Sequence, residues 1–319
     1  MLEKLIGLYG PSSHENSVRD FIENRLNGVC EVSRDNIGNV IAHIPGPGKK
    51  LLLGAHMDEI GVMVTFIDDK GFLRFAPVGG LTAAHLPFKR VKFPNGTVGV
   101  IGYGEKAEIK HMYIDIGASS KEEAEKLVKI GDMAEFETVY HNNGKIVTSG
   151  KLDDRVGCAV LLSLAEKIKN PKCDLFFAFT VQEEVGLKGA GPAAFGTEPD
   201  MAIAVDVTGT GDTPDSDPMA VSLGGGAAIK VKDGGMMASP VVRDLLEKVA
   251  KENEIPYQLE ILSGGTTDAA KMQITAGGVP AGAVSVPTRY IHTPSETASV
   301  KDIEAVENLL EKLIMSGEI

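Results

Sequence analysis

The chain has 319 residues, of which 43% are hydrophobic and 24% charged, and this balance predicts an ordinary globular core. Acidic residues outnumber basic residues by 44 to 32, so the formal charge of -12 argues against nucleic acid or anionic membranes as partners. No apolar run approaches the roughly 18 residues that a membrane span needs. The N-terminus carries no targeting pattern either, so we expect a cytoplasmic protein.

The first 61 residues predict the start of an α/β domain. Ser12 and Glu15 fit a capping box, and the apolar residues that follow recur at helical spacing, so we expect a helix here. Two strands are predicted next, over Asn39–Ile44 and Leu51–Ala55. The second strand is apolar throughout, which is typical of a strand buried on both faces.

Between residues 62 and 149 the pattern changes to short β-rich runs broken by Gly, Pro and Asn. Val62–Ile67 and Phe72–Ala76 are predicted strands joined by a turn, and the one clear helix of this region begins after Ser120. Short strands at this density predict a small β-barrel or sandwich. We interpret residues 62–149 as an inserted domain, because the α/β rhythm returns afterwards. Residues 1–61 and 150–319 then form one main domain.

From residue 153 onward, helices alternate with apolar strands. The predicted elements are a helix over Val156–Ile168, strands over Leu175–Val181 and Met201–Val207, a helix that opens at Ser239-Pro240, and a last helix capped by Ser299 with Asp302. This alternation predicts an α/β fold with a mostly parallel sheet flanked by helices.

Imidazole and carboxylate side chains follow the ends of the predicted strands. Because ligands bind at the carboxyl ends of strands in open α/β sheets, we expect these side chains to converge. Two histidines with three carboxylates suit a pair of zinc-type ions that share one bridging carboxylate. The candidate metal ligands are His56, Asp206 and His292, together with one residue of the pair Asp153-Asp154 and one of the pair Glu183-Glu184.

Two further carboxylates lie beside these candidates. Asp58 is two residues from His56, so in an extended chain both face the same side and Asp58 can orient the imidazole. Glu183 and Glu184 are adjacent and point to opposite sides, so one can bind metal while the other faces an attacking water. The remaining histidines lie outside this arrangement; these are His14, His43, His85, His111 and His141.

Each motif alone has an ordinary structural explanation. A His-x-Asp after a strand is usually a surface or packing histidine, and a Glu-Glu pair is usually a solvated face. Asp153-Asp154-Arg155 alone fits a helix N-cap with a salt bridge. The metal-site hypothesis is preferred because four predicted strands, with long apolar runs, deliver such groups to one edge of the predicted sheet, while Asp153-Asp154 begins the helical segment just before one of these strands.

At these residues the chain resembles metallopeptidase family 42, the tetrahedral aminopeptidases, some members of which carry an older endoglucanase label. The resemblance spans nearly the whole chain in the family order. Its segments are Ala55–Gly61, Lys151–Gly157, Val181–Gly186, Asp206–Thr208 with Gly211–Pro214, Ser263–Asp268 and Arg289–Glu296.

The resemblance implies a role for each candidate. Asp153 would bridge two metal ions, zinc or cobalt; Asp154 is the alternative, and we choose Asp153 because related folds use the first of the pair. His56 and Asp206 would complete one metal site, with Glu184 and His292 completing the other. As catalytic residues, Glu183 would be the general base and Asp58 the support for His56.

The family also implies a zinc-exopeptidase-like fold, with the inserted domain mediating dimerisation and assembly. Twelve subunits would form a hollow tetrahedron.

The expected function is therefore that of a metal-dependent aminopeptidase that hydrolyses N-terminal residues from peptides. One alternative is a glycoside hydrolase of the endoglucanase type, which needs two carboxyl groups about 5 to 9.5 Å apart. The absence of Trp and an aromatic content of 5% count against a sugar-stacking site. The other alternative is a non-catalytic member of the fold, and the intact ligand set with Glu183 counts against it. The native metal and the preferred first residue stay open.

Overall fold

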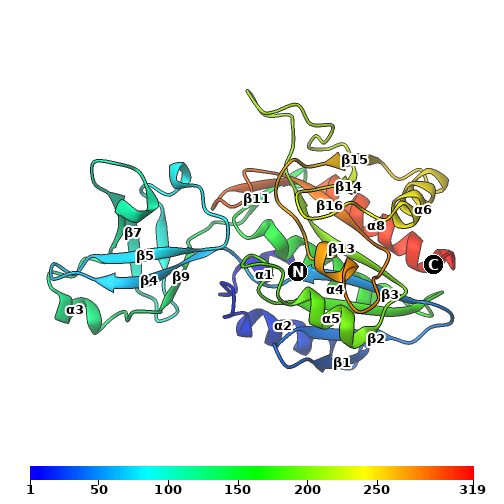
Figure 1. Cartoon of the computed structure of the whole chain (residues 1–319), viewed down its shortest axis with the longest axis horizontal. Coiled ribbons are helices and arrows are strands. Elements are labelled where there is room, and N and C mark those ends of the chain that lie inside the picture. The colour runs from blue at the N-terminus through cyan, green and yellow to red at the C-terminus, as the bar shows by residue number, and fades with distance from the viewer.

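A computed structural model describes residues 1–319, which form a helix-flanked sheet with a smaller barrel projecting from one side (Figure 1). The large sheet has eleven strands, and its centre is parallel. The four central strands lie in the order β12 (Asp174–Thr180), β3 (Lys50–His56), β13 (Met201–Thr208) and β16 (Ala281–Arg289).

Antiparallel strands extend this centre on both sides, so the sheet as a whole is mixed. On one side lie β2 (Val40–Ile44) and β1 (Glu31–Arg34). On the other side lie β17 (Glu296–Ser299), β11 (Ile146–Ser149) and β10 (His141–Asn142). Strand β14 (Ala227–Lys232) pairs with β16 and with β15 (Tyr257–Ile261).

Helices cover both faces of the sheet, because its central strands are apolar on both sides. In β3, Leu51 and Leu53 belong to a core cluster of 45 buried residues, whereas Leu52 belongs to a smaller cluster on the opposite face. The first face carries α1 (Leu2–Ile6), α2 (Asn16–Leu26), α4 (Leu152–Lys167), α6 (Pro240–Glu252) and α8 (Val300–Ser316). The second carries α5 (Ala190–Thr197) and α7 (Ala269–Gln273).

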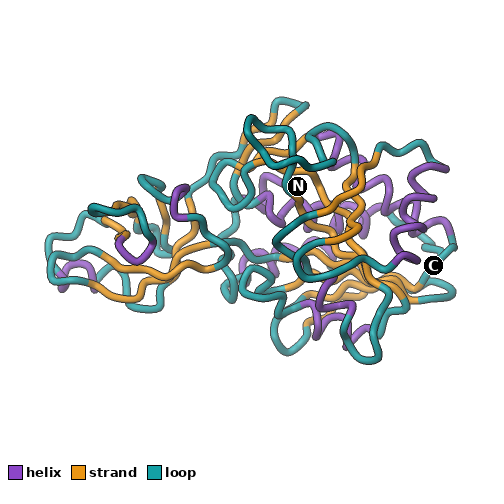
Figure 2. The backbone as a smooth tube through the Cα atoms, turned by 45° about the horizontal axis from the view of Figure 1, so that its top comes forward, coloured by secondary structure: helices purple, strands orange, loops and turns teal.

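The projecting unit is a closed six-stranded barrel with its own core of 15 buried residues, set apart from the main domain in Figure 2. Around the barrel the strands are β4 (Gly61–Ile67), β5 (Leu73–Val78), β8 (Met112–Asp115), β7 (Val98–Tyr103), β6 (Arg90–Lys92) and β9 (Met133–Phe136). The short helix α3 (Lys121–Glu125) and the 3-10 turns Ala83–His85 and Ile109–His111 also belong to this part of the chain.

The fold class predicted from the sequence is confirmed, including the inserted barrel, with two local differences. Strands β10 and β11 fall within residues 62–149 but belong to the large sheet, where β11 pairs with β17 and β10 pairs with β11, so the barrel itself ends at Phe136. Helix α2 begins after Glu15 without any side-chain cap, and α8 begins after Ser299 in the same way. The capping predictions at these two helices are wrong, because the polar side chains bind groups elsewhere in the fold. No helix is long and apolar enough to cross a membrane.

Candidate metal centre

Five side chains from different elements meet at the carboxyl edge of the parallel strands. His56 is the last residue of β3, and Asp206 lies near the end of β13. Glu184 follows β12, His292 lies between β16 and β17, and Asp153 is in the first turn of α4. The topology explains the convergence, because parallel neighbours end at the same edge of the sheet.

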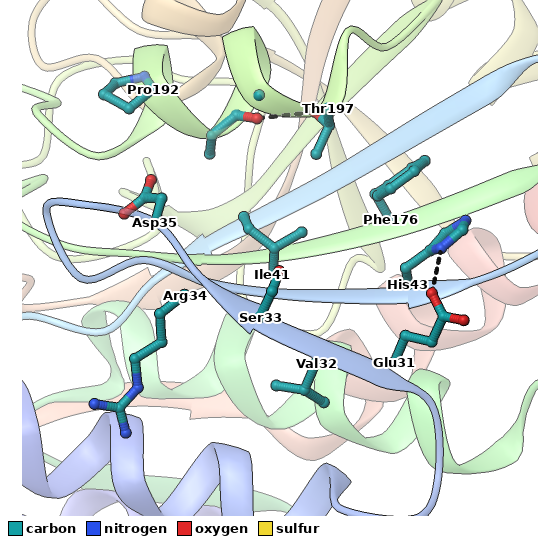
Figure 3. Close-up of a pocket in the computed structure, with 12 residues that line it drawn as sticks. Glu31, Val32, Ser33, Arg34, Asp35, Ile41, His43, Phe176, Pro192 and Thr197 are labelled. Carbon is teal, nitrogen blue, oxygen red and sulfur yellow. Dashed lines mark hydrogen bonds and ion pairs between the residues drawn. The ribbon is translucent and has the colours of Figure 1, made fainter.

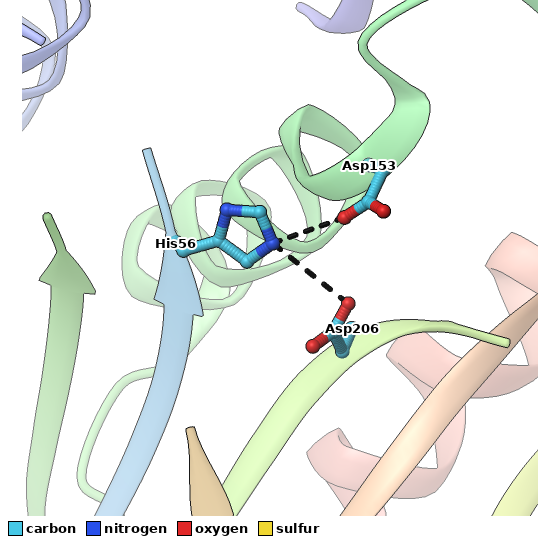
Figure 4. A group of neighbouring side chains, drawn as sticks. All are labelled: His56, Asp153 and Asp206. Carbon is cyan, nitrogen blue, oxygen red and sulfur yellow. Dashed lines mark hydrogen bonds and ion pairs between the residues drawn. The ribbon is translucent and has the colours of Figure 1, made fainter. Parts of the chain in front are cut away.

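Asp153 lies between the two histidines and presents one carboxylate oxygen to each. Its Oδ1 is 3.0 Å from His56 Nε2, and its Oδ2 is 3.2 Å from His292 Nε2. Asp206 Oδ1 is 3.9 Å from His56 Nε2, and Figure 4 shows both carboxylates facing the same imidazole nitrogen. On the other side, Glu184 Oε2 is 3.2 Å from His292 Nε2.

These atoms form two groups, each able to hold a metal ion. His56, Asp153 and Asp206 make one group, and Asp153, Glu184 and His292 make the other; in each, the ligand atoms lie within 4.8 Å of one another. Nitrogen and carboxylate oxygen are the donors that zinc-type ions bind. Glu184 Oε1 is also buried without a hydrogen-bond partner, so a ligand atom is free to bind.

The charges of the centre also favour cations. Burial, together with the nearby Asp153 carboxylate, raises the pKa of Asp206 to about 8. Burial opposes ionisation of Asp153 as well, but its hydrogen bonds with His292 and His56 hold its pKa below the ordinary value. Two imidazoles and three carboxyl groups thus share a buried site, where a divalent cation would favour the ionised form of the carboxyl groups and the neutral form of the imidazoles.

Glu183 is buried beside the centre without belonging to either group of ligands. Its Oε2 is 4.0 Å from His56 Nε2. Burial raises the pKa of Glu183 well above its ordinary value, and the Asp206 carboxylate adds to this effect against the opposing influence of His56. A carboxyl group with a raised pKa can take up and release a proton near neutral pH.

Asp58 connects His56 to the turn that carries Glu183 and Glu184. Its Oδ1 is 3.4 Å from His56 Nδ1 and accepts the backbone N–H of Glu183 at 2.9 Å. Its Oδ2 accepts the backbone N–H of Glu184 at 3.2 Å. Asp58 therefore orients both the imidazole and the adjacent turn.

The neighbouring Asp154 is directed elsewhere. Its Oδ2 accepts the backbone N–H of His56 at 3.2 Å, and its Oδ1 accepts that of Gly157 at 3.0 Å. Both carboxylate oxygens are therefore engaged by backbone groups, and Asp154 belongs to neither metal-binding group.

Two buried acids near the centre were not singled out by the sequence reasoning. Glu296 accepts the backbone N–H groups of Asp153, at 3.0 Å, and of His292, at 2.9 Å. Asp268 accepts the hydroxyl of Thr180. Both residues end segments that carry the family resemblance, so the signal was present, but nothing in their spacing tells which backbone groups they meet.

A cavity of about 320 Å³ opens over the ligands, large enough for a side chain. Its lining combines Leu187, Val207, Leu262 and Ile291 with Thr208, Thr266, Thr267 and Lys230. Its position beside Asp153 and Glu183 makes it the candidate substrate pocket.

A second cavity of about 430 Å³ lies between β1, β2 and α5, away from the ligands (Figure 3). Its histidine, His43, stacks on Phe176 at 4.2 Å and meets the carboxylates of Asp174, at 2.7 Å, and Glu31, at 3.3 Å. Because these groups satisfy one another, the cavity offers no free reactive side chain. The other four histidines outside the centre are exposed.

The family model and the similar proteins all point to the same family. A family model described as M42 glutamyl aminopeptidase matches residues 38–309. A putative aminopeptidase of Acetivibrio thermocellus is 52% identical over 321 residues, covering 98% of this chain and 97% of the relative. Lysyl aminopeptidase of Pyrococcus furiosus is 34% identical over 334 residues, covering 98% and 96%.

Solved structures agree with the sequence matches. The Pyrococcus horikoshii TET1 peptidase, which can assemble into a tetrahedron or a large octahedral shell, superposes with a TM-score of 0.89 at 34% identity. The superposition covers 100% of this chain and 98% of that structure.

Proposed function

Because the chain belongs to the M42 glutamyl aminopeptidase family and is therefore an aminopeptidase, we propose that it removes residues from the N-terminus of peptides with two divalent metal ions. The observation that supports the two-metal site most directly is the position of Asp153, whose two oxygens face two different histidines. A carboxylate in that position could be shared by two metal ions, a ligand arrangement that suits two-metal hydrolases.

Each proposed metal site takes the shared Asp153 and two further ligands. His56 and Asp206 complete one site, and Glu184 and His292 complete the other. Zinc or cobalt is the proposed metal, since both accept nitrogen and carboxylate ligands. Bound at these residues, the metals would supply Lewis-acid chemistry that lowers the pKa of the attacking water and polarises the scissile carbonyl.

The protein's own residues then handle the proton. Glu183 accepts the proton from the attacking water as the new carbon–oxygen bond forms, and returns it to the nitrogen of the departing peptide as the carbon–nitrogen bond breaks. Its raised pKa suits both directions of transfer. Asp58 holds the His56 imidazole and the Glu183 backbone at fixed positions relative to each other during the reaction.

Restriction to the N-terminus requires an anchor for the free amine. We propose that a carboxylate beside the metals holds this amine, while the first side chain enters the cavity over the proposed ligands. Relatives are named for both glutamyl and lysyl activity, so the family does not dictate which first residue this chain prefers.

The geometry of the site favours neither alternative function. One similar solved structure, from Thermotoga maritima, is named an endoglucanase, but the family model and the curated relatives reported above are named as aminopeptidases and do not support the glycoside hydrolase hypothesis. A non-catalytic role is disfavoured because both groups of ligands and Glu183 are present together.

The deciding experiment compares one peptide with its N-acetylated copy. The unblocked peptide should be shortened from its N-terminus one residue at a time, whereas the acetylated copy should persist, because acetylation removes the amine that anchors the substrate. Mass spectrometry of a timed digest reads both outcomes. Internal fragments from the acetylated peptide would refute the aminopeptidase proposal while leaving the metal centre intact.

We further propose that the chain forms a homo-oligomer, twelve subunits arranged as a tetrahedron, with the barrel as the contact module. One similar solved structure is described as a dodecamer, and the TET1 peptidase can assemble into a tetrahedron or a large octahedral shell. The barrel region also exposes large apolar side chains, including Phe66, Phe88 and Ile130, which would be covered in an assembly. The cytoplasm is the proposed location of this assembly.

A further inference from the structure

The segment Tyr9–Glu15, which precedes helix α2, is bound to Glu59 and to other residues beside the candidate metal centre. The backbone N–H of Glu59 donates to Gly10 O at 3.1 Å, and the backbone N–H of Gly10 donates back to Glu59 Oε1 at 2.9 Å. Pro11 and Glu59 form an isolated parallel bridge. This segment lies N-terminal to residues 38–309, the part of the chain that the family model matches.

Two side chains of this segment reach the residues that carry the chemistry. Ser12 Oγ donates to Asp58 Oδ2 at 2.6 Å, and both residues are buried. Glu15 Oε1 accepts the backbone N–H of Gln182 at 3.1 Å, immediately before the Glu183-Glu184 pair. Ser12, through Asp58, and Glu15, through the backbone of Gln182, therefore both support the turn that carries Glu183 and Glu184.

We propose that Ser12 is a positioning residue for the aminopeptidase reaction. The Asp58 carboxylate is fully buried. It accepts hydrogen bonds from the Ser12 hydroxyl and from the backbone N–H groups of Glu183 and Glu184, and it lies 3.4 Å from the His56 imidazole. Ser12 is the one partner that belongs neither to a metal ligand nor to the general base. Its hydroxyl fixes Asp58 Oδ2, the oxygen that also holds the backbone of Glu184.

The consequence of losing this bond follows from the geometry. Without the Ser12 hydroxyl, Asp58 Oδ2 loses a short charge-assisted hydrogen bond in a site that water cannot easily refill. The Asp58 carboxylate is then freer to rotate. The turn at residues 183–184 becomes more mobile as well, because both of its backbone N–H groups donate to Asp58. Misplacement of a general base reduces turnover more than it reduces substrate binding.

The test compares Ser12→Ala with Ser17→Ala, in full-length protein loaded with the same metal. Ser17 is an exposed serine in α2 that makes no side-chain hydrogen bond, so it controls for the same chemical change. Loss of a group that hydrogen-bonds a metal ligand directly typically costs about 10- to 100-fold, and Ser12 acts one contact further out, through Asp58. We expect Ser12→Ala to lower kcat by about tenfold with little change in KM, and Ser12→Thr, which keeps the hydroxyl, to recover most of it.

A second measurement is independent of activity. Deuterium exchange followed by mass spectrometry should show faster uptake in the peptide covering residues 181–187 of Ser12→Ala, and unchanged uptake there in Ser17→Ala. Uptake in α8 should be the same in both variants. Wild-type exchange and wild-type kcat in Ser12→Ala would overturn the proposal, and so would a general loss of protection across the whole fold.

The kinetic arm rests on the proposed function, but the exchange arm does not. Wild-type protein that fails to shorten unblocked peptides would contradict the aminopeptidase proposal alone. The exchange of residues 181–187 would still decide whether Ser12 positions the turn.

Discussion

Replacing Glu183 with glutamine separates proton transfer from metal binding. The side chain is buried next to His56, at 4.0 Å, but belongs to neither group of ligands. Glutamine has nearly the same shape, so the turn held by Asp58 should persist, while the carboxylate that accepts a proton is gone. A positioned general base contributes about 10²- to 10⁴-fold to turnover. At 1.36 kcal/mol per tenfold, this amounts to about 2.7 to 5.4 kcal/mol of the activation barrier.

The assay measures kcat on an unblocked peptide amide at saturating metal, with elemental analysis of the same sample. Glu183→Gln should bind the wild-type amount of metal and lose at least about a hundredfold in kcat. Glu184→Gln is the matched control, because it makes the same change one residue away in a proposed metal ligand. This variant should bind less metal than the wild-type protein does. Near-normal turnover in Glu183→Gln, or metal loss equal to that of Glu184→Gln, would refute the assignment of the two roles.

Three further predictions concern metal, assembly and the core. Chelation should abolish peptide cleavage and added zinc or cobalt should restore it, because carboxylate and imidazole ligands release their metal to a stronger chelator; full activity in a sample that contains no metal would contradict this. Ile130→Asp, which places a charge on an exposed apolar residue of the barrel region, should reduce the particle size in light scattering, and an unchanged large particle would count against the barrel as the contact module. Phe177→Ala should destabilise the fold by about 3–5 kcal/mol in denaturant unfolding, because Phe177 is fully buried in β12. Its matched control, Phe195→Ala, removes a ring that is 67% exposed and should have little effect; equal losses would show that burial does not set the cost.

Much of the main domain and of the barrel could be predicted, because local residue patterns indicate their strands and helices. The apolar run Leu51–Ala55 and the mixed pattern at Val62–Ile67 correctly predicted β3 and β4. Strands buried on both faces leave a continuous apolar run, and polar residues directly after such runs fall at the sheet edge. The proposed metal ligands were found in this way, and the structure brings them within reach of one another.

The partners of individual polar side chains were decided only by the tertiary structure. Ser12 and Glu15 have the spacing of a capping box, yet they bind Asp58 and the backbone of Gln182. Asp302 likewise accepts the backbone N–H groups of Gly224 and Gly226 instead of capping α8 with Ser299.

The end of the insertion was also decided by long-range contacts. Residues 141–149 have the short-strand pattern of the barrel, but β11 pairs with β17, a strand that lies about half a chain length further on, and β10 pairs with β11. Local spacing fixes how a segment can fold and which of its faces is apolar. The group that a buried hydroxyl, carboxylate or strand edge finally meets depends on which distant segments the hydrophobic core brings together, because a buried polar group takes whichever partner is within reach.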